Sequence, residues 1–453
     1  MDASEKTSKK RRKLTITSVL LLLSFFGIVA FAIFRLRLKW KLNSRIEAIR
    51  AAGYPVTCAE LDAWYTIPDD AENAAFVILD ALSFYQEWDK DKLNALPLAG
   101  RAELPARTEP LPEEMKTRIA EYIADNNEAV ELLHAGAEIE HCRYPVDFAA
   151  GFAARLNHLP NMRRSLMLVN LEALLHAENN ETDAAIRSVI SGFGLARSLS
   201  MEPCTISQLA RMGCHSLLLS TLERVINRAD LTDGQLIELI ESLCDIERTS
   251  NISHAYVGER CMALSLFTAP TSIDSDLFES VPARPILILF QGIGLLDMDA
   301  VIYLDLIEDY IEATRLHYPQ RLKASDSINA RIESMSNIHI LTREVMPALS
   351  RVITIEARTI AHLRTARAGL AVQRYRLATG AIPDMRSQLV PDYLDAVPKD
   401  PFDGNELRYK KREAGLIIYS IGEDLSDDGG KEKPKYSERK TNPNWDVTFI
   451  VER

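Results

Sequence analysis

The sequence predicts a mainly α-helical protein with one N-terminal membrane-spanning helix and a small C-terminal module of mixed helix and sheet. Three observations lead to this fold class: an uncharged apolar stretch at 14–34, helical periodicity through most of 36–346, and short strand-like segments near the C-terminus. We therefore expect a basic cytoplasmic tail at 1–13, the span at 14–35, a helical domain at 36–346 and an α+β module at 347–453.

The N-terminal stretch Leu14–Phe34 is the strongest local pattern. It contains no charged residue and is long enough for a helix to cross a bilayer core of roughly 30 Å. A signal peptide is the competing interpretation, but the stretch is longer than a typical signal core and no A-x-A-like site follows it. We predict an uncleaved anchor. Basic residues flank both ends, so the positive-inside rule alone does not orient the span.

Shorter helices are expected on either side of the central part of the domain. The span continues as an amphipathic helix to about Ala52, and Thr57 is placed to cap the next helix, with Glu60 in the reciprocal capping position. Single helices are expected at 113–133 and at 325–346.

The central part of the domain is expected to form helical hairpins. Helices are predicted at 161–178, 182–199, 205–228 and 232–247, with Thr232 as the N-cap of the last. The alternation of helix and turn resembles a tetratricopeptide rhythm, but the signature residues of that repeat are absent. We therefore predict hairpins without a named repeat.

The segment ILILFQGIGLLDMDAVIYLDLI, residues 286–307, is apolar enough to suggest a second membrane span. Gln291, Asp297 and Asp299 interrupt it, and the uncharged core that remains is too short to cross a bilayer. We expect a helix that is buried or that docks on a surface.

The helix that contains YLDLIEDYIEAT, residues 303–314, carries four carboxylates at i, i+3, i+4 and i+7. They are Asp305, Glu308, Asp309 and Glu312. Like charges at this spacing repel, so the face needs cations. A di-metal site in a helical bundle would use Glu-x-x-His pairs, which the sequence lacks. We expect a solvated or ion-paired face. Candidate partners on the long helix expected at 347–379 are Arg358, Arg364, Arg367 and Arg374.

Composition and motifs favour binding to a protein partner over nucleic-acid binding or catalysis. The chain of 453 residues has a net charge of −11, so nucleic-acid binding is not expected. No H-E-x-x-H, G-x-S-x-G or P-loop motif occurs, and the six cysteines form no C-x-x-C pair. Cys204 and Cys214 either pair across a helix start or are buried as small apolar residues. A nucleophile and base distant in sequence would leave no motif, so an enzyme is the alternative.

The C-terminal region contains four pieces that together resemble one known family. They are YRLATGAIP at 375–383, SQLVPDYLDAVPKDPFDGNELRY at 387–409, LIIYSIGEDLSDDGG at 416–430 and WDVTFIV at 445–451. This region is similar to the globular end of the major pseudopilins of type II secretion, the secretion protein G family. The resemblance implies a long helix and a small sheet that lie outside the cytoplasm. The span would then cross the inner membrane with the N-terminus on the cytoplasmic side.

The rest of the layout resembles single-pass membrane proteins of planctomycete-type bacteria, whose helical domain begins with AAGYPVTCAELDAWY, residues 51–65 here. Pseudopilins have a Glu five residues into the apolar helix, which 13–34 lacks, and here hundreds of residues separate span and sheet. The expected function is a non-catalytic envelope protein with a structural or interaction role linked to type II secretion. An atypical minor pseudopilin is a further alternative.

The resemblance also implies a calcium site, because many pseudopilins bind calcium in the corresponding loop. Calcium takes six to eight oxygen ligands, and five carboxylates are available here. The candidate ligands are Glu423, Asp424, Asp427, Asp428 and Asp446. The spacing differs from an EF-hand, and the basic insertion KEKPKYSERK at 431–440 can neutralise the loop instead. A solvated turn is therefore the alternative.

Overall fold

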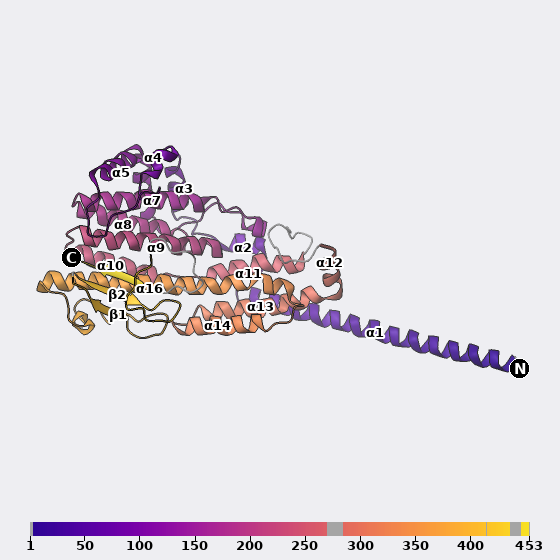
Figure 1. Ribbon diagram of the computed structural model, residues 1–453. Coiled ribbons are helices and arrows are strands. Elements are labelled where there is room, and N and C mark those ends of the chain that lie inside the picture. Colours follow the sequence, from indigo (N-terminus) through magenta and orange to yellow (C-terminus); the bar gives the residue numbers. More distant parts are fainter. Residues whose placement is uncertain (1–2, 270–283, 414, 435–444, 453) are drawn as a thin grey trace.

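The computed structural model describes residues 3–269, 284–413, 415–434 and 445–452, with side chains from Ile16 onward (Figure 1). The predicted mainly helical class is confirmed, with 64% helix and 4% strand. Helix α1 (Ala3–Ala51) is continuous over 49 residues and projects from one end of the body. It is long and apolar enough to cross a membrane, and none of its most apolar window is buried.

The first half of the body consists of helices stacked side by side (Figure 1). In chain order they are α2 (Cys58–Trp64), α3 (Ala74–Ala81), α4 (Lys90–Asn94), α5 (Glu113–Asp125), α6 (Asn127–Glu138), the 3-10 helix η1 (Phe148–Ala153), α7 (His158–Glu178), α8 (Thr182–Arg197), α9 (Thr205–Arg228), α10 (Asp233–Arg248) and α11 (Ser253–Thr268).

The second half adds five helices, a short 3-10 turn and a sheet. They are α12 (Arg284–Ile293), α13 (Leu295–Ala313), α14 (Gln320–Glu333), α15 (Ile340–Val345), α16 (Pro347–Thr379), η4 (Arg386–Leu389), β1 (Arg408–Lys411), β2 (Leu416–Ser420) and β3 (Val447–Val451). The strands are antiparallel in the order β1-β2-β3, and β2 is buried along its whole length.

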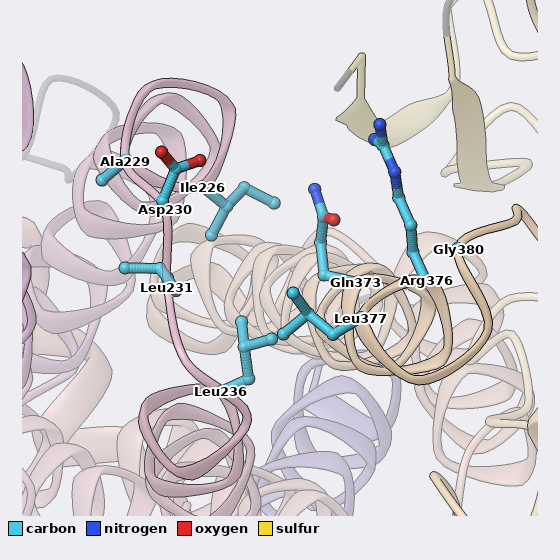
Figure 2. Close-up of a pocket in the computed structure, with 9 residues that line it drawn as sticks. All are labelled: Ile226, Ala229, Asp230, Leu231, Leu236, Gln373, Arg376, Leu377 and Gly380. Carbon is cyan, nitrogen blue, oxygen red and sulfur yellow. The ribbon is translucent and has the colours of Figure 1, made fainter.

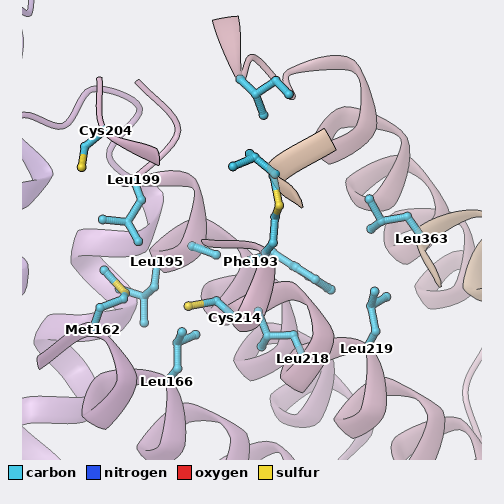
Figure 3. Packing of buried hydrophobic residues seen from close by; sticks show 14 of the residues in the cluster. Met162, Leu166, Phe193, Leu195, Leu199, Cys204, Cys214, Leu218, Leu219 and Leu363 are labelled. Atoms are coloured by element: carbon cyan, nitrogen blue, oxygen red, sulfur yellow. The ribbon is translucent and has the colours of Figure 1, made fainter. Parts of the chain in front are cut away.

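The predicted hairpin helices are confirmed as α7 to α10, and the long helix at 347–379 as α16. Local capping explains these bounds. Thr232 and Gln235 form a capping box at the start of α10, and Gly380, in the left-handed region at φ 71°, ends α16. The apolar faces then pack between α7, α8 and α9 (Figure 3), where Leu166, Leu195 and Leu218 are at most 1% exposed.

Three local expectations are wrong in detail. The single helix expected at 113–133 is divided at the buried Asn126 into α5 and α6. The Asn126 side-chain amide accepts the N–H of Gln86 and donates to the carbonyl of Tyr122. The expected helix at 325–346 is divided into α14 and α15. At α2, Thr57 caps the helix as predicted, but the Glu60 carboxylate accepts the N–H of Val56 rather than that of Thr57.

The expectation that the acidic face of α13 would be ion-paired is confirmed, but the predicted partners are wrong. The pairs are Asp305 with Arg45, Glu308 with Arg260, Asp309 with Arg331 and Glu312 with Arg315. The arginines of α16 face other elements and pair with Glu423, Glu247 and Asp233. The packing of α13 against α1, α11 and α14 determines which cations reach its carboxylates.

The sheet packs directly on α16 and on the hairpins. A Cβ at Gly369 of α16 would lie 2.5 Å from the ring of Phe449, so only glycine lets the strand approach this closely. On α9, the amide of Asn227 donates to the Ile450 carbonyl at 2.8 Å and accepts the Glu452 N–H at 2.7 Å. Long helix, sheet and hairpins therefore share one hydrophobic core. The domain boundary at 346/347 stays a prediction.

Candidate functional site

The predicted calcium ligands lie in the loop after β2 and at the start of β3, and most of them stabilise turns. Asp424 accepts the N–H of Ser426 at 3.1 Å, and Asp427 accepts the Gly429 N–H at 3.0 Å and the Tyr419 hydroxyl at 3.1 Å. Glu423 turns away from the others and pairs with two arginines of α16, Arg351 and Arg358, at 3.1 and 2.5 Å.

The remaining two candidates, Asp428 and Asp446, are close together. Asp446 accepts the N–H groups of Gly430 and Asp428, while one carboxylate oxygen of Asp428 is buried without a hydrogen-bond partner. Burial, followed by the charges of Asp427 and Asp428, raises the pKa of Asp446. Within the described ranges, no group of three or more His, Cys, Asp or Glu side chains is arranged to hold a metal ion. Calcium binding at this loop stays a prediction.

A larger candidate site lies beside this loop, in a groove of about 550 Å³ between α9, α16 and the C-terminal segment. We call it the α9–α16 groove. Its apolar floor is formed by Leu209, Met212, Leu219, Ile355 and Val447. Its polar lining comprises Ser216, Ser220, Glu223, Arg358, Thr359, His362, Glu423, Glu432, Lys433, Asp446 and Thr448. The α9 residues recur every three or four positions, so one helical face supplies a whole wall.

Glu223 is the most perturbed acid in the groove. Its carboxylate pairs with Arg107 at 3.1 Å and accepts the N–H of Ile450 at 3.0 Å. Burial raises its pKa to about 7, more than Arg107 lowers it, and the carboxylates of Glu432 and Glu452 add to the rise. Since a raised carboxyl pKa favours the protonated form, the contribution of this group to stability decreases as pH rises from the usual glutamate range to about 7.

One other lining group is held in a single charge state. Burial lowers the pKa of His362 to about 4, so this imidazole is neutral at physiological pH. The Arg358–Glu423 pair links α16 to the C-terminal loop at the rim. A concave site with an apolar floor, fixed polar groups and one acid poised near neutrality is suited to binding a ligand in a defined orientation.

A smaller cavity of about 350 Å³ lies at the far end of α16, next to the turn between α9 and α10 (Figure 2). Leu231, Leu236 and Leu377 form its apolar side, while Asp230 and Arg376 supply its charged groups. It offers a concave shape and a few polar contacts.

The helices also bring together a serine, a histidine and a glutamate that lie far apart in sequence. The hydroxyl of Ser191 on α8 is 2.7 Å from Nδ1 of His134 on α6, and Nε2 of that histidine is 2.8 Å from Glu172 on α7. Ser188 donates to the same glutamate at 2.7 Å. Burial alone would raise the pKa of Glu172, but hydrogen bonds from His134 and His176 lower it to about 2.

This Ser–His–Glu cluster has the connectivity of a catalytic triad but not its surroundings. The ring is reversed, because a hydrolase triad presents Nε2 to the serine. Ser191 lies inside α8, whose backbone N–H groups serve the helix and leave none for an oxyanion hole. The arrangement fits a polar bridge between α6, α7 and α8.

No protein-family model, curated protein or solved structure matches this chain. The pseudopilin resemblance is therefore carried by residues of this chain alone. Sequence reasoning missed Glu223 and the Ser–His–Glu cluster because neither forms a motif. The one signal for Glu223 was a carboxylate between the apolar residues Leu222 and Val225 in the last turns of α9.

Proposed function

We propose that this protein is a non-catalytic, single-pass membrane protein of the bacterial envelope that binds a polypeptide partner in the α9–α16 groove. The groove itself is the observation that carries the proposal, because it combines the largest of the cavities described above with an apolar floor and a charged rim. The partly exposed side chains of Leu209, Ile355 and Val447 would contact apolar residues of the partner, and the rim charges would fix its direction.

The proposed location rests on α1 and on the C-terminal residues. We place the protein in the inner membrane with the N-terminus inside and the body outside the cytoplasm, as the pseudopilin resemblance implies. Asp400 of the PKDPFDG segment accepts hydrogen bonds from Ser420 and from the N–H of Ile421 in the YSIGED segment. The two halves of the pseudopilin-like pattern thus form one hydrogen-bonded unit. The role linked to type II secretion is proposed from the resemblance.

The groove can be blocked without disturbing the fold. Gly213 lies in the groove wall of α9 and is exposed, and a Cβ added there would meet no atom within 4 Å, so we expect Gly213→Phe to place its ring in the groove and leave the helix intact. A photo-crosslinking amino acid at the exposed Ser216 is expected to capture the partner in native membranes. Gly213→Phe is expected to reduce that cross-link about tenfold, which corresponds to ~1.4 kcal/mol of binding.

The matched control is Gly234→Phe on α10, where an added Cβ also meets no atom within 4 Å but lies outside the groove lining. It should leave the cross-link unchanged. A cross-link from Ser216 that survives Gly213→Phe, or that appears equally from the exposed Asp326 on α14, would contradict binding in the groove.

An extracytoplasmic hydrolase is the alternative function, favoured by the Ser–His–Glu contacts. If the cluster is a structural bridge, a fluorophosphonate probe is expected to give no labelling that depends on Ser191. Labelling of the full chain that disappears in Ser191→Ala but persists in Ser188→Ala would establish a reactive serine and overturn the non-catalytic proposal. Mass spectrometry of the labelled peptide provides the measurement.

A further inference from the structure

Helix α12 exposes a cluster of large apolar side chains at the end of the body from which α1 emerges (Figure 1). Ile286, Ile288, Leu289 and Ile293 are 44%, 52%, 59% and 38% exposed, whereas only Leu287 is fully buried. No charged residue occurs between Pro285 and Leu296. Outside α1, the other exposed large apolar residues in the described part of the chain are scattered over separate elements.

The direction of α13 relative to α1 is fixed by two ion pairs. Arg35 pairs with Asp297 at 2.7 Å, and Arg45 pairs with Asp305 at 2.8 Å. From the first pair to the second, the residue number increases on both helices. The part of α1 that follows the apolar stretch therefore runs parallel to α13. The start of α13 therefore lies level with Arg35, one residue after the stretch ends at Phe34.

At this level the chain turns sharply. The axes of α12 and α13 differ by 81°, and Gly294 between them is in the left-handed region at φ 91°. A Cβ at Gly294 would lie 2.2 Å from the guanidinium of Arg35, so glycine also allows α1 to approach the bend. Because α13 follows the axis of α1, α12 extends nearly perpendicular to the span, at the height where the span ends.

We propose that α12 lies in the interface of the same bilayer that α1 crosses, with its exposed apolar residues inserted at the boundary between headgroups and acyl chains. This inference rests on the proposed membrane anchor. A helix of 10 residues is about 15 Å long, half the thickness of a bilayer core, so it cannot span. Helices with a broad apolar surface bind in the interface plane instead.

The adjacent surface of α1 suits the same interface. Trp40 is 72% exposed, and Arg37, Lys39 and Lys41 are also exposed beside it. Tryptophan is enriched at the level of the headgroups, and basic side chains attract anionic lipids there. Together, α12 and this segment of α1 would hold the body at a fixed height and tilt on the membrane.

The test uses nitroxide labels on the full chain in vesicles of phosphatidylethanolamine and phosphatidylglycerol, with the partly accessible Cys58 and Cys244 replaced by serine. Labels are placed in separate variants at Leu289→Cys on α12, Leu22→Cys in the span and Asp326→Cys on α14. Collision with oxygen, which concentrates in lipid, is compared with collision with a water-soluble nickel complex. The ratio of oxygen collision to nickel collision is expected to be at least tenfold higher for the Leu289 label than for the Asp326 label.

Each other outcome is decisive. A Leu289 label as accessible to nickel as the Asp326 label, with the Leu22 label in lipid, would overturn the role of α12 and leave the anchor intact. A Leu289 label shielded from both reagents would mean that protein covers the patch, which also overturns the proposal. A Leu22 label accessible to nickel would instead refute the anchor, and the inference with it.

Discussion

Replacing Asp400 with alanine is expected to lower the free energy of unfolding of the C-terminal sheet by about 3–5 kcal/mol, the usual cost of breaking a buried charged network. Its side chain is fully buried and accepts the N–H groups of Phe402 and Ile421 at 3.0 Å, the Ser420 hydroxyl at 2.8 Å and the Arg408 guanidinium at 2.6 Å. Removing the carboxylate leaves three buried donors, the N–H groups of Phe402 and Ile421 and the Ser420 hydroxyl, without this acceptor, while Arg408 keeps Asp403.

Hydrogen exchange of the β2 peptide in the full chain measures this effect, because local unfolding of the sheet exposes those amides. The control is Asp403→Ala, which removes a second carboxylate from the same arginine. Asp403 and its pair with Arg408 are partly exposed to solvent, unlike the fully buried Asp400, so the expected cost is smaller, about 1 kcal/mol. Equal protection of β2 in Asp400→Ala and wild type would refute the role of Asp400.

Substituting Gly258 with alanine is the second change for which we expect a large effect. Gly258 lies within α11, where glycine costs roughly 0.5–1 kcal/mol relative to alanine unless close packing demands it. A Cβ there would be 1.8 Å from the carbonyl oxygen of Pro203, a backbone atom that precedes α9. The next residue, Glu259, accepts the N–H and hydroxyl of Thr205 and so holds the start of α9 in place.

Because backbone cannot move as a side-chain tip can, Gly258→Ala is expected to cost about 3 kcal/mol, at the upper end for overpacking. Chemical unfolding of the full chain in detergent, followed by circular dichroism, provides the measurement. Gly234→Ala on α10 is the matched control, since its added Cβ meets nothing and should stabilise the helix by about 0.5–1 kcal/mol. If both variants unfold at the same denaturant concentration, close contact at Gly258 is refuted.

Several features followed from short stretches of sequence. The fold class, the apolar α1, the bounds of α9 and α16 and the three strands were all predicted. Each depends on residues within a few positions of one another: a terminating Gly380 for α16, or residues favoured in strands near the C-terminus; the cap Thr232 predicted the start of α10 in the same way. Local signals of this kind do not depend on tertiary contacts, so they can be recognised in the sequence alone.

Tertiary packing decided the candidate sites. The carboxylates of α13 were expected to need cations, but Arg45 and Arg260 reach them rather than the arginines of α16, because α1 and α11 are the helices that pack against α13. The buried surroundings of Glu223 and the contact of Ser191 with His134 likewise arise where elements distant in sequence meet.

The segment at 286–307 illustrates both parts of this division. Its composition predicted that it would not cross a membrane as one span and would be buried or dock on a surface. Only the structure decided that the segment bends by 81° at Gly294, buries α13 and exposes α12. The physical reason is that helical propensity depends on neighbours within about one turn, whereas the direction and environment of a helix depend on which distant elements pack against it.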